Sequence, residues 1–278
     1  MAGQARLAAG NRAALAVLLG CSAIAWYFTV LQAQGMPSGP GTMGSGLGVF
    51  LADWTLMMTA MMLPALAPMA AVYLRSIRAT PSPAARAART TALVAGYLVS
   101  WAMFGAVAFI AALLAAQLAI AAPDAAPWVG AAVVATAGVY QLTPLKDFCL
   151  RHCRSPIAFL LHVSGYRGRF RDLRVGVYHG AYCVGCCWGL MVVLTAVGLT
   201  NLVWMAAIAA AVLLEKTWRH GRALARILGV ALLVFAIFVP ANPALLPGLH
   251  VSPGMGMQAS AQIPGASICS TTLKAARG

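Results

Sequence analysis

The segment His179-Gly-Ala-Tyr-Cys183-Val-Gly-Cys186-Cys187-Trp-Gly-Leu-Met191 places an imidazole and three thiols inside an apolar run long enough to cross a lipid bilayer. At about 100° per residue, His179, Cys183 and Cys186 fall within a narrow arc of a helix, and Cys187 lies on its flank. One face of this helix is therefore rich in the soft donors that transition metals bind. Because polar groups are costly in hydrocarbon and are usually functional there, the segment predicts a transmembrane helix that carries a metal or redox site.

The composition of the whole chain also indicates a membrane protein. Of its 278 residues, 62% are hydrophobic and only 9% are charged, and the mean hydropathy is +0.84. This balance excludes an ordinary water-soluble domain of the same length. A net charge of +14 would favour nucleic acid in a soluble protein, but here the basic residues lie in short clusters between apolar stretches. We therefore expect the lipid bilayer as the surroundings and no nucleic-acid partner.

Seven apolar stretches have roughly the length that a bilayer requires, which predicts an all-α, polytopic transmembrane helical bundle. The stretches cover residues 13–31, 48–73, 91–119, 128–145, 177–198, 201–216 and 223–239. They form one predicted domain over residues 1–240, followed by an external irregular tail over residues 241–278. Pro64 and Pro68 interrupt the second stretch, where they should kink the helix and free backbone carbonyls near Ala60.

The distribution of basic residues predicts the orientation of the bundle. All but two of the 19 Lys and Arg residues precede the first stretch or follow an even-numbered one. Only Lys274 and Arg277 fall on the opposite side, so we expect a cytoplasmic N-terminus and an external C-terminus. An even number of spans would break this alternation.

The connections between the stretches contain two further candidate features. The basic loop over residues 146–175 carries apolar residues at helical spacing, which predicts a short helix on the inner membrane surface, either with a role at the site or as a lipid anchor alone. The external segments 32–46 and 240–264 hold soft donors that could capture metal, although such residues are also common in loops. The apolar residues of the basic loop are Ile157, Phe159, Leu160, Leu161 and Val163. The soft donors of the external segments are Met36, Met43, His250, Met255 and Met257.

Five of the seven cysteines are clustered, whereas Cys21 and Cys269 are isolated. The odd count and the clustering argue against a disulfide framework and favour metal ligands or redox groups. Cys149 and Cys153 follow the fourth stretch, and Cys183 lies about two turns into the fifth from the same side, so we expect the two clusters to meet. The alternative is that the thiols are only packed, because glycines at 176, 180, 185 and 189 indicate close helix contacts.

A methionine-rich stripe on the second stretch is a third candidate. Met57 and Met61 share a helix face with Asp53, and thioethers can pass Cu(I) along without the cost of burying a charge. Methionine is also ordinary core filler, so packing is the alternative. Asp53 needs a partner, water or a proton inside the bilayer. Glu215, next to Lys216, is expected to be a locally paired residue at the interface.

Three strings in this sequence resemble the DUF2182 family of predicted metal-binding bacterial integral membrane proteins. They are Trp54-Thr-Leu-Met-Met-Thr-Ala-Met-Met-Leu-Pro64, Tyr140-Gln-Leu-Thr-Pro-Leu-Lys-Asp-Phe-Cys-Leu-Arg-His-Cys-Arg-Ser-Pro156 and Gly176-Val-Tyr-His-Gly-Ala-Tyr-Cys-Val-Gly-Cys-Cys-Trp-Gly-Leu-Met191, followed by Glu215-Lys216. The resemblance spans residues 50–217 and implies a metal-binding, multi-pass protein of the bacterial inner membrane.

Three functions fit these features. The first is binding of a soft transition metal for transfer, transport or homeostasis, with a metallochaperone or another membrane subunit as partner. Copper is favoured because thioethers accompany the thiols, and zinc is the alternative ion. The second is a thiol–disulfide oxidoreductase with Cys183/Cys186 and Cys149/Cys153 as its pairs, although the charge distribution places both pairs on the reducing side. The third is a structural or assembly subunit with packed cysteines. No oligomeric state and no catalytic residue is predicted.

Overall fold

The computed structural model describes residues 2–35, 42, 45–80, 82–198, 201–242 and 245–246, with side chains from residue 14 to residue 34 in the first helix. These residues form helices and no strand. In chain order the helices are α1 (Ala2–Gly35), α2 (Leu47–Ser76), α3 (Pro83–Ala121), α4 (Ala126–Leu142), α5 (Pro144–Arg154), α6 (Pro156–His162), α7 (Arg171–Val197), α8 (Leu202–Thr217) and α9 (Gly221–Phe238).

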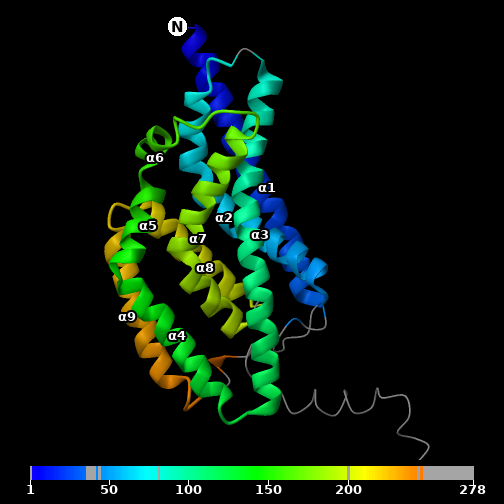
Figure 1. The fold of residues 1–278 in the computed structure, drawn as a ribbon, viewed down its shortest axis with the longest axis vertical. Coiled ribbons are helices and arrows are strands. Elements are labelled where there is room, and N and C mark those ends of the chain that lie inside the picture. Colours follow the sequence, from blue (N-terminus) through cyan, green and yellow to red (C-terminus); the bar gives the residue numbers. More distant parts are fainter. Residues whose placement is uncertain are drawn as a thin grey trace, which may run out of the picture.

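The long helices run along the longest axis of the molecule, with α7 at its centre (Figure 1). α7 packs against α3 on one side and against α4, α5 and α8 on the other. Its most apolar window is 61% buried, compared with 22% for α3 and 28% for α9, because α3 and α9 expose wide apolar faces. The start of α1, the connection from α2 to α3, and α6 lie toward the same end of the molecule (Figure 1).

Five of these helices are long and apolar enough to cross a membrane, namely α1, α2, α3, α7 and α9. A sixth crossing results if α4 and α5, which meet at a 63° bend, form one broken span. α8 has 16 residues and is shorter than a typical crossing. Each of the seven predicted stretches coincides with a helix, but the number of crossings and the orientation remain predictions.

The fourth predicted stretch is wrong at its end. It was expected to continue to residue 145, but α4 ends at Leu142 and a new helix begins at Pro144. Thr143 is extended, and its side chain accepts a hydrogen bond from the backbone N–H of Lys146, which makes it the N-cap of α5. Pro144 at the first position of α5 suits a helix start. Residues Cys149 and Cys153 therefore lie on a helix and not in a loop, whereas the predicted short helix is confirmed as α6.

The prolines of α2 free a backbone carbonyl, as predicted. Pro64 has no N–H to donate to the carbonyl of Ala60, one turn before it. The hydroxyl of Ser22 from α1 donates to this carbonyl instead, with an O···O distance of 2.7 Å, and Ser22 is buried. The helix interruption in α2 is therefore compensated by a hydrogen bond from its neighbour, which also fixes the register of α1 against α2.

The glycines of α7 allow the close contacts that their spacing predicted. A methyl group at Gly176 would collide with the backbone carbonyl of Leu93 in α3, and one at Gly180 would lie 2.6 Å from the Ser100 hydroxyl oxygen. A methyl group at Gly185 would lie 2.9 Å from the Cys149 sulfur of α5. The backbone of α7 thus lies directly against α3 and α5, which brings the side chains of all three helices together.

Candidate metal centre

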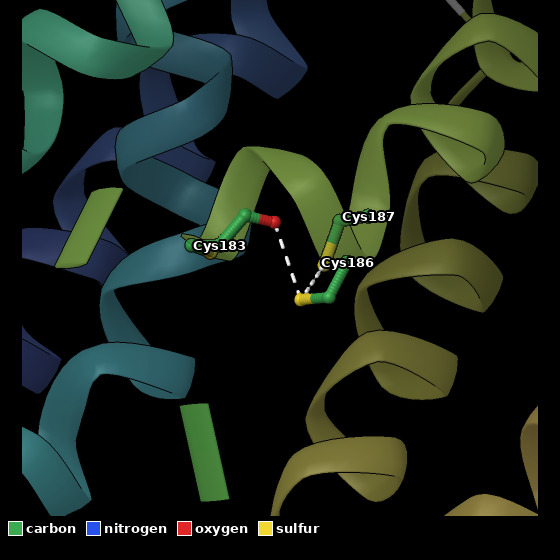
Figure 2. A group of neighbouring side chains, drawn as sticks. All are labelled: Cys183, Cys186 and Cys187. Carbon is green, nitrogen blue, oxygen red and sulfur yellow. Dashed lines mark hydrogen bonds between the residues drawn. The ribbon is translucent and has the colours of Figure 1, made fainter. Parts of the chain in front are cut away.

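Three thiols of α7 form a buried cluster. Cys183, Cys186 and Cys187 are each at most 1% exposed, and their sulfur atoms all lie within 4.8 Å of one another. Figure 2 shows the Cys186 sulfur between its two partners, donating to the Cys183 carbonyl at 3.2 Å and lying 3.2 Å from the Cys187 sulfur. Among the described residues, it is the one group of at least three His, Cys, Asp or Glu side chains that lie close enough together to share one ion.

The helix itself brings these thiols together. Positions i, i+3 and i+4 lie on one helix face, so Cys183, Cys186 and Cys187 project toward the same region. The neighbours α3, α5 and α8 cover this face, because small residues on α7 let them approach closely. The cluster is therefore preformed on one element, and the surrounding helices decide its charge and its accessibility.

A lysine and a tyrosine contact the cluster at Cys183. The ammonium group of Lys216, at the end of α8, donates to the Cys183 sulfur at 2.7 Å, and the hydroxyl of Tyr97 from α3 lies 3.0 Å from the same sulfur. Lys216 is 9% exposed, and no salt bridge to a carboxylate is found for it among the described residues. A cation beside the sulfur stabilises a thiolate, which is the form of cysteine that binds metal. Sequence spacing gave no indication of this role for Lys216.

A second buried charge lies beside the first. Lys146 of α5 and Glu215 of α8 form an ion pair at 2.8 Å with both side chains 1% exposed, and Gln141 bonds to both of them. The expectation that Glu215 pairs locally is therefore wrong, as is the placement of Lys146 in a basic loop. The two residues are 69 positions apart, so sequence spacing gave no signal of their contact.

The end of α8 is held by an arginine from α5. Arg154 donates to the backbone carbonyl of Glu215 at 2.8 Å and to that of Arg219 at 3.3 Å. The last carbonyls of a helix lack partners within the helix, and a cation there also interacts favourably with the helix dipole. Together with the Lys146–Glu215 pair, this contact fixes the last turn of α8 and directs Lys216 toward Cys183.

The second predicted cysteine cluster lies next to the first. The sulfur of Cys153, in the last turn of α5, is 3.8 Å from the sulfur of Cys186. Cys149, one turn earlier, faces Gly185 of α7. Both α5 cysteines are partly exposed, in contrast to the three on α7. The expectation that the two clusters lie side by side agrees with these contacts, whereas a role as ligands remains a prediction.

His179 lies one turn before Cys183 but outside the group of three thiols. Its side chain is 2% exposed and packs against the rings of Phe159 and Tyr97, with centroid distances of 5.0 and 6.0 Å. Its Nδ1 atom is buried and has no hydrogen-bond partner among the described residues. A buried ring nitrogen without a partner is costly, and binding an ion would compensate for it.

The remaining candidates are not brought into the thiol cluster. Met57 and Met61 are buried in the core, 6% and 2% exposed, and Asp53 accepts a hydrogen bond from Gln32 of α1 at 3.1 Å. The stripe approaches the cluster through the neighbouring Met62, whose carbonyl accepts a bond from the Tyr97 hydroxyl at 3.4 Å. The external candidates Met36, Met43, His250, Met255 and Met257 lie outside the described residues, as does Cys269.

The sulfur positions fit a soft ion. With metal–sulfur bonds of about 2.3 Å, two sulfurs on one ion lie about 3.8 Å apart at a tetrahedral angle and about 4.6 Å apart in linear coordination. The distance between Cys153 and Cys186, 3.8 Å, already falls in this range. The sulfurs of Cys186 and Cys187, at 3.2 Å, need to open by only about half an ångström.

Comparisons with known proteins give one match. Neither the search of curated proteins nor the search of solved structures returned a significant relative. The family model PpoB2, described as a copper chaperone, matches residues 51–239 and so includes α3 to α9, nearly all of α2, and every residue of the cluster and its surroundings. This supports the copper-related part of the expectation drawn from the sequence. The chain belongs to the PpoB2 family of copper chaperones.

Proposed function

We propose that this protein binds Cu(I) through Cys183, Cys186 and Cys187 within a multi-pass helical bundle of the bacterial inner membrane and delivers it to another protein. The observation that carries the proposal is the three-thiol cluster, with its sulfurs within 4.8 Å, in a member of a copper chaperone family. Copper is the cargo, and the bundle is the scaffold that keeps it from water and from competing ligands.

The donor set favours Cu(I) over Zn²⁺. Structural zinc sites are almost always four-coordinate, whereas three sulfurs suffice for a monovalent soft ion. The group next to the Cys183 sulfur is the Lys216 ammonium group and not a fourth ligand. Lys216 also offsets part of the negative charge that several thiolates leave around a monovalent ion, and a buried complex costs less as its net charge falls.

Other predicted residues have supporting roles in this proposal. His179, with its unpartnered Nδ1, is a candidate additional ligand after a small movement. The stripe of Met57 and Met61, with Asp53 near the opposite end of α2, is a candidate route for copper from the external side toward the thiols. A soluble metallochaperone or a membrane subunit would receive or supply the ion.

Metal analysis of protein purified in detergent under anaerobic conditions tests the proposal. We expect about one equivalent of copper in the wild-type protein and almost none when Cys183, Cys186 and Cys187 are all changed to Ser. Cys21→Ser is the matched control, because Cys21 is exposed on α1 and lies outside the cluster. A copper content in the triple variant equal to that of the wild-type protein would refute the proposal. Zinc in place of copper would mean that the site holds zinc and not Cu(I).

A second candidate function is thiol–disulfide exchange, favoured by the 3.8 Å contact between the sulfurs of Cys153 and Cys186. This contact joins the two helices and differs from the pairs Cys183/Cys186 and Cys149/Cys153 expected from spacing. Exchange requires thiols that oxidise reversibly in pairs. If this function is correct, mass mapping of protein exposed to a mild oxidant should reveal a Cys153–Cys186 disulfide. The purified protein should then also hold no metal.

A further inference from the structure

We infer that Cys153 is the transfer ligand of the copper site, the thiol through which Cu(I) passes between the buried cluster and a partner that presents exposed thiolates. This inference rests on the proposed function and divides the cysteines by role. Cys183, Cys186 and Cys187 hold the ion, whereas Cys153 exchanges it.

A gradient of exposure supports the division. The cluster thiols on α7 are at most 1% exposed, so a partner protein has no direct access to them. Cys153 is partly exposed, and its sulfur lies 3.8 Å from that of Cys186. It is therefore both open to the surface and within bonding range of an ion held at Cys186, because two sulfurs on one ion lie about 3.8 Å apart.

Other side chains cover the cluster on the sides of Cys183 and Gly185. Lys216 and Tyr97 occupy the side of Cys183, and both are largely or completely buried. On the side of Gly185, the Cys149 sulfur fills the space against the α7 backbone. Among the described residues, Cys153 is the one cysteine outside α7 whose sulfur contacts a cluster sulfur.

Cys153 lies in a strongly basic turn of α5. Cys153 lies in the last turn of α5, which also contains Arg151, His152 and Arg154. Three basic residues in one turn belong at the aqueous or headgroup boundary and not in hydrocarbon. A water-soluble partner can therefore reach this turn without entering the bilayer.

The exchange step balances without any redox reagent. In outward transfer, the Cys153 thiol loses its proton to water and its sulfur forms a bond to Cu(I), which raises the coordination number by one. The bonds from copper to the cluster sulfurs then break one after another as thiolates of the partner bind, and each freed cluster thiolate takes up a proton. Copper remains Cu(I) throughout, and the last bond, to Cys153, is displaced by a partner thiolate in the same associative exchange.

Transfer kinetics test the inference. Protein in detergent is loaded with one equivalent of Cu(I), and its loss to the water-soluble chelator bathocuproine disulfonate is followed by stopped-flow absorbance. We expect Cys153→Ser to keep its copper with an affinity close to wild type and to release it at least about tenfold more slowly. Cys153→Met, which retains a soft donor, should recover part of the rate, and Cys21→Ser should match wild type.

Two results would overturn the inference. Wild-type release from Cys153→Ser would remove Cys153 from the route, and loss of bound copper in this variant, with copper retained in Cys21→Ser, would make it a resident ligand. A wild-type protein that binds no copper would instead refute the proposed function before any transfer is measured. Failure of the inference and failure of the function are therefore distinguishable.

Discussion

A single buried lysine gives the cluster its electrostatic character. Lys216 reaches the Cys183 sulfur at 2.7 Å, and no carboxylate ion pair is found for it in the described residues. An unpaired cation in a protein interior is strongly unfavourable, so the thiolate is its natural counter-ion. The sequence could suggest the cysteines as ligands from their spacing, but it gave no sign of this lysine, because contact across 33 residues depends on how α8 packs.

Replacement of this lysine should weaken copper binding. Lys216→Met keeps the length of the side chain and removes its charge, so we expect a Cu(I) affinity lower by about ten- to hundredfold, as for other residues that orient or neutralise metal ligands. Lys216→Arg retains the charge and should recover part of the affinity. Competition with a Cu(I) chelator measures the effect. Equal affinities in both variants would show that charge at this position is irrelevant to the site.

The Lys146–Glu215 pair should show strong coupling. Both side chains are 1% exposed, so removal of one partner leaves an uncompensated buried charge. We expect Lys146→Met or Glu215→Gln alone to lower the free energy of unfolding by about 3–5 kcal/mol, and the double variant to lose much less than the sum. Denaturation in mixed detergent micelles gives these values. Additive losses would mean that the pair is not formed.

At the level of elements, the hydrophobic pattern predicted the helices well and their interruptions less well. Each of the seven apolar stretches became a helix, and the glycine spacing of α7 predicted its close contacts. α5 was missed because its apolar residues alternate with charged ones over only 11 positions, which resembles a basic loop. The turn chemistry at Thr143 and Pro144 was the signal that could have revealed it.

The bond between Ser22 and the Ala60 carbonyl gives a prediction at this scale. Ser22→Ala should lower the free energy of unfolding by about 1 kcal/mol, because a carbonyl in an apolar environment loses its donor. In a Pro64→Ala background the helix supplies its own N–H to this carbonyl, so the same substitution should cost almost nothing. A double-mutant cycle measures the difference. An equal cost in both backgrounds would contradict this account of α2.

Glycines of α7 provide a matched pair of variants. Gly176→Ala should force α3 and α7 apart, because the new methyl group would meet the backbone of Leu93, which cannot rotate away. We expect a loss of about 1–3 kcal/mol and a lower copper content, since Tyr97 lies one turn along the same contact. Gly189→Ala meets Ala137 at an ordinary 3.6 Å and should change neither quantity. Similar losses in both variants would mean that the loss does not come from the close contact between Gly176 and Leu93.

The whole molecule builds its site from elements distant in sequence. The thiols come from α7, the adjoining sulfur from α5 and the cation from α8, and the family match covers all three. Sequence reasoning could identify the thiols of α7 and α5 and place them at a similar depth by counting turns. It could not place Lys146 or Lys216, because charge counting assigns basic residues to the ends of apolar stretches and to the loops between them.

The role of α8 decides the topology of the molecule. With 16 residues, α8 is about 24 Å long, whereas the hydrocarbon core is about 30 Å thick. Both of its ends have partners, since Asn201 accepts from the Trp204 N–H and Arg154 bonds to the Glu215 carbonyl, so local thinning of the bilayer could accommodate it.

If α8 crosses, and α4 with α5 forms one span, the chain has seven spans and its ends lie on opposite sides of the membrane. We therefore expect alkaline phosphatase to be active when fused after residue 278, because it needs the oxidising side to form its disulfides. The same enzyme fused before residue 1 should be inactive and serves as the control. An inactive C-terminal fusion with a cytoplasmic N-terminus would mean six spans, with α8 inserted from one side only, and it would place the C-terminal tail on the side of Cys153.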